Sequence, residues 1–386
     1  MTPHPSDHAR VGVLVFGPQE TADAVYGGGR GGVVTAMEAM GDFLDRRGVQ
    51  HSYCGYSVRT RSRIWHLMLP ARLCVDMFRL ACRLAPWVSI VHVVANGPYG
   101  VYRTLAASLV SRAAFRKVFV DVRGNNLDAY SREEGSWAQR RAWRVVLALA
   151  EAVLVQPRST CAALRRSFGD KIVHHPNWIR APLNPPCRNI LSDEMIRVIF
   201  VGFCYEAKGI RDLVTGCALA CEHGMRIELS LIGHEDQKCA SWLDRVGPQQ
   251  GLIIRRLGRQ PRDQVLSQLA RSDIFVFPSY HPGEGHPNAV NEAAASGLAI
   301  VTTPVGSVIE FLDSESAYFV AARSASDISA LLQHIGCHRS EARAKAQRAQ
   351  ETVLRDFSED RVLGGLLNAY GRTVKVREDA RPAHRC

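Results

Sequence analysis

The chain has 386 residues, more than a single hydrophobic core usually supports, so two domains are expected. Hydrophobic residues make up 46% and charged residues 22%, which is ordinary for a soluble globular protein. The 48 lysines and arginines against 37 acidic residues give a net charge of +11. This charge predicts affinity for phosphorylated small molecules, acidic lipid or nucleic acid, and alone it does not choose among them.

The N-terminal segment MTPHPSDHAR is polar and lacks the apolar core of a signal peptide. No uninterrupted apolar run approaches the roughly 18 residues that a membrane-spanning helix needs. We therefore expect a cytoplasmic protein that is not integral to the membrane. The 11 cysteines include no CxxC pair and no ligand cluster, so we interpret them as reduced core thiols.

The first half of the chain alternates short β-branched runs with stretches of helical period. Strands are predicted at 11–17, 89–95, 117–122, 152–157 and 171–175. A helix is predicted at 33–46, where Val33, Met37, Met40 and Leu44 fall on one face. Apolar strands that alternate with helices predict a parallel sheet covered on both faces.

A glycine-rich loop, GPQETADAVYGGGRGG, connects the first strand to that helix. Its glycines at 27, 28, 29, 31 and 32 leave few side chains before a helix N-terminus, where backbone N–H groups can approach an anion closely. The loop does not fit G-x-G-x-x-G well, and no GxxxxGK followed by Ser or Thr occurs. A flexible surface loop is the alternative interpretation.

Residues 59–87 hold six arginines and one acid, Asp76, interleaved with leucines, methionines and aromatic residues. This composition suits a pair of helices lying on an anionic bilayer surface. Ordinary helices with apolar core faces and extended arginine side chains are an equally good interpretation.

A proline-rich segment divides the chain, because four prolines between 176 and 186 exclude a continuous helix or central strand. We expect an N-terminal domain at 1–180, a linker at 181–195 and a second domain at 196–357. Strands of this second domain are predicted at 196–202, 225–233, 252–258, 273–279, 299–304 and 317–320. A last helix is predicted at 358–375, followed by a charged tail at 376–386.

Two loops of the second domain carry candidate binding residues. Lys208 follows a strand end and precedes a helix, where it can meet a phosphate, although a solvated surface lysine fits equally well. The stretch HPGEGHPNAVNEAAASG, residues 281–297, passes from a loop into a helix near Pro287 that stops at Gly297. The free N–H groups between Gly285 and Asn288 and the helix dipole favour an anion there.

Two carboxylates accompany that helix start. Glu292 lies one turn after Asn288 on the same face of the helix. A carboxylate beside a phosphate is unfavourable unless it accepts hydrogen bonds from hydroxyls, and a ribose diol supplies two. Glu284 in the loop can likewise accept hydrogen bonds from a sugar. A capping role for Glu284 and solvent exposure of Glu292 are the simpler interpretation.

Glu284 and Glu292 resemble the EX7E motif in the donor site of the retaining glycosyltransferases of family 4. The similarity continues into LGRQPRDQVLSQLARSDIFVFPS upstream and AIVTTPVGSVIEFL downstream, and VGFCYEAKG resembles the strand and Lys-Gly of the family. HHPNWI resembles the segment that closes the N-terminal domain, and FSEDRVLGGLLNAY the last helix, which packs back on it. Together these segments cover nearly the whole chain. The resemblance implies an α/β GT-B fold, with two doubly wound Rossmann-like domains facing a central cleft.

The resemblance also implies roles for individual residues. Glu284 would contact the transferred sugar as a catalytic residue, Glu292 would bind the ribose, and Lys208 would neutralise the diphosphate. The base would lie near residues 257–259. The donor-binding residues implied are Gly31, Gly32, Lys208, Gly258, Arg259, Gly285, His286, Asn288, Ala289 and Glu292. His286 is interpreted chiefly as a residue that shapes the turn.

Two positions depart from the family pattern. Phe203 stands where members often have an arginine that pairs with the lysine on the diphosphate, so either Lys208 acts without that partner or Arg255, Arg256 or Arg259 substitutes. Arg123 stands where many members have a histidine near the donor sugar. Arg123 is counted as a catalytic candidate that binds a phosphate or an acceptor hydroxyl, because arginine cannot act as a base at neutral pH.

The resulting hypothesis is a transferase that moves a sugar from a UDP- or GDP-linked donor to a glycan or lipid-linked acceptor. No Asp-x-Asp triplet occurs, so neither a metal nor another cofactor is expected, and no nucleic-acid partner is expected. Attachment to the inner face of the membrane through 59–87 would present a lipid-linked acceptor. Two alternatives stay open: a nucleotide-sugar epimerase of similar shape and a non-catalytic protein that binds anions or nucleic acid.

Overall fold

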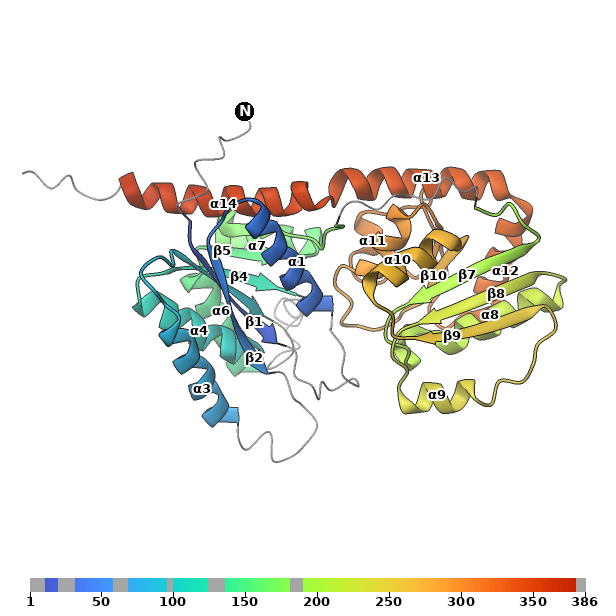
Figure 1. Ribbon diagram of the computed structural model, residues 1–386, viewed down its shortest axis with the longest axis horizontal. Helices are drawn as coiled ribbons and strands as arrows, with labels where there is room; N and C mark the ends of the chain where they lie inside the picture. The colour runs from blue at the N-terminus through green and yellow to red at the C-terminus, as the bar shows by residue number, and fades with distance from the viewer. Residues whose placement is uncertain are drawn as a thin grey trace, which may run out of the picture. The chain divides into compact units, whose positions relative to one another are not determined.

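The computed structural model describes residues 11–19, 32–57, 69–95, 100–123, 136–180 and 190–379. They group into two compact units, Met1–Asn177 with Asp360–Cys386 (unit 1) and Trp178–Glu359 (unit 2). Figure 1 follows the chain from blue through green to red. Each unit contains a six-stranded sheet, and every strand pair in the two sheets is parallel. Among the described residues, no helix is long and apolar enough to cross a membrane.

Unit 1 alternates strands and helices and receives the last helix of the chain. Its strands are β1 (Val13–Gln19), β2 (His51–Ser57), β3 (Ile90–Ala95), β4 (Lys117–Val122), β5 (Ala152–Val155) and β6 (Ile172–His174). Its helices are α1 (Gly32–Arg46), α3 (Leu69–Cys82), α4 (Gly100–Ala113), α6 (Trp137–Leu149), α7 (Arg158–Phe168), the short η2 (Gly169–Lys171) and α14 (Glu359–Asp379). The strand order is β2-β1-β3-β4-β5-β6.

Both faces of this sheet are covered, as the continuous burial of β3 requires. On one face, Val91 and Val120 share a core with Leu80 of α3, Val101 of α4 and Val146 of α6. On the other face lies α14, whose fully buried Tyr370 meets the ring of Phe119 at 4.8 Å between ring centroids (Figure 1). The last helix therefore completes the core of the first unit.

Unit 2 is built on a doubly wound parallel sheet. Its strands are β7 (Met195–Val201), β8 (Arg226–Ile232), β9 (Leu252–Gly258), β10 (Ile274–Phe277), β11 (Ala299–Thr302) and β12 (Tyr318–Phe319). Its helices are η3 (Glu206–Lys208), α8 (Ile210–Glu222), α9 (Gln237–Leu243), α10 (Arg262–Arg271), α11 (Asn288–Ala295), η4 (Val308–Glu310), α12 (Ala325–Cys337) and α13 (Arg339–Asp356). The order β9-β8-β7-β10-β11-β12 reverses direction between β7 and β10, and such a reversal is where sheets of this type bind ligands.

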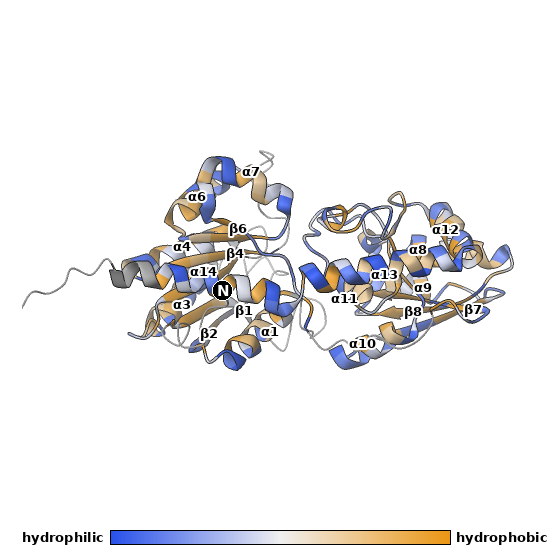
Figure 2. Ribbon diagram, turned by 90° about the horizontal axis from the view of Figure 1, so that it is seen from above, coloured by the Kyte–Doolittle hydropathy of each residue, from blue (hydrophilic) through white to orange (hydrophobic). Residues whose placement is uncertain are grey.

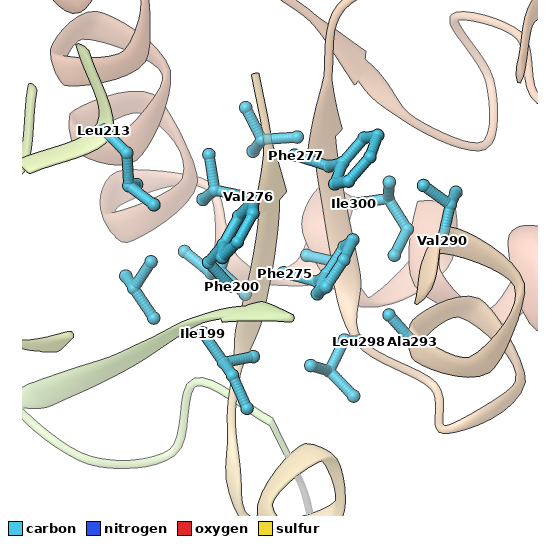
Figure 3. Packing of buried hydrophobic residues seen from close by; sticks show 14 of the residues in the cluster. Ile199, Phe200, Leu213, Phe275, Val276, Phe277, Val290, Ala293, Leu298 and Ile300 are labelled. Atoms are coloured by element: carbon cyan, nitrogen blue, oxygen red, sulfur yellow. The ribbon is translucent and has the colours of Figure 1, made fainter. Parts of the chain in front are cut away.

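The core of unit 2 follows from the alternation of side chains along β10. Val276 lies towards Leu213 of α8, whereas Phe275 and Phe277 lie on the side of Val290 of α11 (Figure 3). All five side chains are at least 98% buried. Figure 2 shows that the strands of unit 2 consist mostly of hydrophobic residues, whereas helices such as α10 and α13 also contain hydrophilic ones.

Every strand predicted from the sequence is confirmed to within two residues at each end, and the strands at 117–122 and 252–258 match β4 and β9 in full. The apolar-run criterion missed β2, the edge strand HSYCGYS. Only Cys54 and Tyr56 of this strand are buried, because its edge position leaves the other side chains partly solvated. The predicted helix at 33–46 corresponds to α1, with Met37, Met40 and Leu44 buried.

Gly209 permits the two loops at the sheet reversal to touch. Its φ is +71°, and a Cβ there would lie 2.4 Å from the carbonyl oxygen of Pro278. We expect Gly209→Ala to lower the free energy of unfolding by more than Gly224→Ala. Gly224 has a φ of +91° but nothing within 4 Å, so it isolates the backbone cost of about 1–2 kcal/mol. Urea unfolding of both variants measures the difference, and equal losses would contradict the close approach.

Candidate functional site

The loops that leave β7 and β10 form one structure at the sheet reversal. The N–H of Tyr280 donates to the carbonyl of Ala207 at 2.8 Å, which joins the β10 loop to η3. Ser279, fully buried, lies two residues after the end of β10. Because neighbouring parallel strands end at the same edge of a sheet, these loops carry their side chains into one place.

Lys208 and Glu284 meet there as an ion pair. The Oε1 atom of Glu284 also accepts a hydrogen bond from the hydroxyl of Ser279 at 3.0 Å. The two charged side chains are only 14% and 11% exposed. Such shielding from water makes the pair stronger than a surface ion pair and makes removal of either partner costly.

The turn after β11 packs against the loop between Glu284 and α11 and forms a hydrogen bond with it. The N–H of Ser307 donates to the carbonyl of Gly285 at 2.9 Å. Gly306, with a φ of +58°, passes so close that a Cβ would lie 2.4 Å from the same carbonyl oxygen. The first intrahelical bond of α11 runs from Asn291 to the carbonyl of Pro287, so the N–H groups of residues 288–290 stand at the open end of the helix.

His286 turns inward rather than towards a ligand. Its ring is 4% exposed and stacks on Phe311 with centroids 4.7 Å apart. Its Nδ1 lies 3.0 Å from the hydroxyl of Ser307, and its Nε2 lies 2.6 Å from the amide of Asn291. These contacts agree with a side chain that shapes the turn, and donor binding at position 286 stays a prediction.

Glu292 of α11 pairs with Arg262, a residue that the sequence did not single out. The Nε and Nη2 atoms of Arg262 lie 3.3 Å and 3.2 Å from Oε1 of Glu292. Burial raises the pKa of Glu292, and the guanidinium of Arg262 opposes that rise. The position of Arg262 in the sequence could have indicated this contact. Arg262 is the first residue of α10, the helix that follows β9 and contacts α11.

Two of the three arginines proposed to replace the missing family arginine are engaged elsewhere. Arg255 pairs with Glu228 at 2.6 Å, and Arg256 pairs with both Glu235 and Asp244. The structure leaves Arg259, which is exposed and makes no ion pair within the described residues. It directly follows Gly258, the last residue of β9.

Aromatic rings border the Lys208–Glu284 pair. Phe203 stacks on His234 with ring centroids 5.5 Å apart and planes inclined by 2°, and it also contacts Tyr205. Tyr205 in turn meets His281 edge to face at 5.9 Å. Burial and the charge of Lys208 lower the pKa of His281, which favours a neutral ring.

Arg123 in unit 1 lies in a buried polar cluster. It is 2% exposed, its Nε donates to Asp121 at 2.7 Å, and its Nη1 donates to Asn177 at 2.7 Å. His92 contacts the same carboxylate at 3.3 Å and the hydroxyl of Tyr370 at 2.6 Å. In this structure the Arg123 N–H groups hold neighbouring segments of the fold, and its role as a catalytic or phosphate-binding residue stays a prediction.

The surroundings of Asp121 and His175 disfavour the protonated form of both side chains. Burial by itself would raise the pKa of Asp121, but the Arg123 guanidinium and a hydrogen bond from His92 hold it well below its ordinary value. Burial and the nearby Arg123 lower the pKa of His175 to about 3. At neutral pH the cluster therefore contains one buried ion pair and a neutral His175.

Other predicted residues are only partly described. Gly31 and the upstream glycines lie outside the described residues, and Gly32 is the first residue of α1. Within 59–87, residues 59–68 also lie outside the described ranges, whereas α3 is described. Among the described residues, no three His, Cys, Asp or Glu side chains gather into a metal-binding group.

The fold is shared with solved glycosyltransferases. The chain has the GT-B fold predicted from its sequence, with two Rossmann-like parallel-sheet units. Sucrose-phosphate synthase from Thermosynechococcus elongatus superposes with a TM-score of 0.71 at 14% identity, over 95% of this chain and 100% of that one. Anabaena Alr3699/HepE in complex with UDP-glucose gives 0.66 at 13% identity, over 95% and 99%.

Residues 196–336 match the family model described as glycosyl transferases group 1, so unit 2 carries a glycosyltransferase-family domain. The putative colanic acid biosynthesis glycosyltransferase WcaL of Escherichia coli K12 is 24% identical over 55% of this chain and 52% of its own length. The amylovoran biosynthesis glycosyltransferase AmsK of Erwinia amylovora is 25% identical over 31% and 30%. The chain thus matches about half or less of the length of these relatives.

The buried His175 makes the stability of unit 1 depend on pH. The unfolded chain takes up this proton near pH 6.5, whereas the folded state does so only near pH 3. The stability that this difference contributes is complete above pH 6.5 and falls as the pH drops, by up to about 1.4 kcal/mol per pH unit.

The free energy of unfolding of the wild type should fall between pH 7 and about pH 5, and we expect it to fall by less in His175→Gln. Urea unfolding at both pH values measures it. His174→Gln, at the half-exposed neighbouring position, is the matched control and should keep the wild-type slope. An unchanged slope in His175→Gln would contradict a neutral buried ring.

Proposed function

We propose that this protein is a retaining glycosyltransferase of family 4 that transfers a sugar from a UDP- or GDP-linked donor to a glycan or lipid-linked acceptor. The observation that carries the proposal is the shielded Lys208–Glu284 pair at the β7–β10 reversal of unit 2. A cation for a diphosphate and a carboxylate for sugar hydroxyls stand together there, beside the open end of α11. Relatives whose names place them in polysaccharide biosynthesis, and a neighbour bound to UDP-glucose, support the same reading.

In this proposal the donor extends over the C-terminal edge of the unit 2 sheet. The diphosphate lies between Lys208 and the N–H groups at the start of α11. The ribose hydroxyls bind Glu292. Arg262 contacts only the Oε1 atom of this carboxylate, so Oε2 can accept hydrogen bonds from the ribose. The base lies beside Gly258 and Arg259, and the transferred sugar lies against Glu284.

The proposed reaction breaks the bond between the anomeric carbon and the diphosphate oxygen, which keeps the electron pair. The sugar passes through an oxocarbenium-like state, and the acceptor hydroxyl attacks the same face. Its proton goes to an oxygen of the departing diphosphate, so no protein base is required. Lys208 and the helix start stabilise the charge that develops on the leaving group, which is where preorganised charge accelerates a reaction most.

The acceptor and the cellular location are also part of the proposal. We infer a lipid-linked glycan in polysaccharide or glycolipid biosynthesis, which would require a cytoplasmic enzyme held at the inner face of a membrane. An epimerase is the competing activity. NMR of a UDP-sugar incubated without acceptor separates them, because an epimerase converts the sugar while a transferase leaves its configuration unchanged.

Substitution of the two motif glutamates should separate chemistry from binding. We expect Glu284→Gln to lower turnover at least about a hundredfold and to leave the Kd for nucleoside diphosphate nearly unchanged. Glu292→Ala should weaken nucleotide binding, because it removes the ribose acceptor.

A thermal-shift screen first identifies the nucleotide, since a specific ligand raises the apparent stability by mass action. Calorimetry and a transfer assay then test the variants. Glu228→Gln, which alters a carboxylate on β8 that pairs with Arg255, serves as the matched control. Wild-type turnover in both motif variants would contradict the assignment.

Transfer should also proceed without divalent metal. The positive charge proposed for leaving-group departure comes from Lys208 and the α11 N-terminus, so about 5 mM EDTA is expected to leave the rate unchanged, whereas Lys208→Met abolishes transfer. Loss of activity in EDTA that Mg²⁺ or Mn²⁺ restores would overturn this part of the proposal.

A further inference from the structure

Three neighbouring helices of unit 1 share an unusual outer surface. Helices α3 and α4 contact each other, as do α4 and α6, so the three form one layer on the sheet (Figure 1). Their inner sides enter the core through Leu80, Val101 and Val146. Their outer sides face away from that core, and we call them the α3-α4-α6 face.

This face gathers most of the large apolar side chains that the described residues expose. Of ten such side chains, seven belong to these helices or to the turn after α4: Val75, Phe78, Tyr102, Leu109, Phe115, Trp137 and Val145. Phe78 is 70% exposed and Trp137 is 68% exposed. Scattered exposed apolar residues need no explanation, but their concentration on one helical layer does.

The charges of the same face have a single sign. The three helices contain seven arginines, Arg72, Arg79, Arg103, Arg112, Arg140, Arg141 and Arg144, and no lysine. Their one acidic residue, Asp76, is 7% exposed and pairs with Arg103 at 3.2 Å. Four of the arginines, Arg79, Arg112, Arg141 and Arg144, are exposed, and none of the three helices exposes an acidic side chain.

Apolar and cationic groups are also mixed at short range. The guanidinium of Arg141 lies 5.5 Å from the centre of the Trp137 ring, one turn away on α6. On α3, Val75 and Phe78 precede the exposed Arg79. Aromatic rings beside arginines suit the boundary between lipid headgroups and acyl chains, where the ring is partly buried and the cation meets phosphate.

We propose that the α3-α4-α6 face docks on an anionic lipid bilayer. A second copy of this chain would bring like charges together, so the exposed arginines disfavour a symmetric dimer through this face. Nucleic acid would match the charge but would leave Phe78, Leu109 and Val145 without an apolar environment. An anionic bilayer satisfies both features at once.

The proposal extends the interface expected from residues 59–87 to α4 and α6, and it uses none of the residues outside the described ranges. It does not rest on the proposed transferase activity. Its test contains neither sugar nor nucleotide, so its failure would count against the proposed location at a membrane and would leave the proposed sugar transfer untouched.

The test is sedimentation of the full chain with vesicles of phosphatidylcholine, with or without about one third phosphatidylglycerol. We expect the wild type to bind the anionic vesicles at least about tenfold more strongly. Arg79→Glu with Arg141→Glu should weaken that binding about 20-fold or more, at roughly fivefold for each arginine lost. Phe78→Ser with Leu109→Ser should weaken it about tenfold while charge is unchanged.

The matched control is Ile253→Ser with Leu354→Ser, which removes two apolar side chains of unit 2 that are 44% and 42% exposed. This control should bind vesicles as the wild type does, and circular dichroism should show that every variant is folded. Equal binding to neutral and anionic vesicles, or equal loss in the control, would overturn the proposal. Tighter binding to RNA than to anionic vesicles, or dimerisation that Phe78→Ser abolishes, would also overturn it.

Discussion

The arrangement of the loops after β7 and β10 depends on one constraint, which is that two charged side chains shielded from water must pair with each other. Lys208 and Glu284 are both mostly shielded from water, and either charge alone at this depth would be costly. They meet because β7 and β10 are adjacent, and because Gly209 lets the first loop pass directly against Pro278. Ser279 then fixes the carboxylate. The strand order, one glycine and one hydroxyl together position a cation and an anion in contact.

The two units contain similar ion pairs with different surroundings. In unit 1, Arg123 and Asp121 are almost fully buried, and Asn177 takes a further N–H of the guanidinium. That pair joins segments of the fold and offers little to a ligand. In unit 2, the pair retains some exposure and stands beside helix N–H groups that have no intrahelical acceptor. The second pair is therefore the more accessible of the two to an arriving ligand.

The sequence predicted the fold well because β-branched runs in a parallel sheet are buried on both faces and therefore conspicuous. It missed β2, since an edge strand with Gly55 and partly solvated residues lacks that pattern. Local patterning placed Lys208 and Glu284 near strand ends, but their contact depends on strand order. The contacts of Arg262 with Glu292 and of Arg123 with Asn177 were missed for the same reason, because the partner lies 30 residues away in the first case and 54 in the second.

The chain passes between its units twice, after residue 177 and again after residue 359. Unit 2 is therefore one contiguous segment, whereas unit 1 needs the last helix, whose Tyr370 is fully buried against Phe119 and His92. During synthesis, unit 2 can therefore complete its core before unit 1, although most of unit 1 is synthesised first. Until residue 370 emerges, His92 of β3 and Phe119 of β4 lack the Tyr370 side chain that packs on them, so unit 1 completes its core only after unit 2 can have done so.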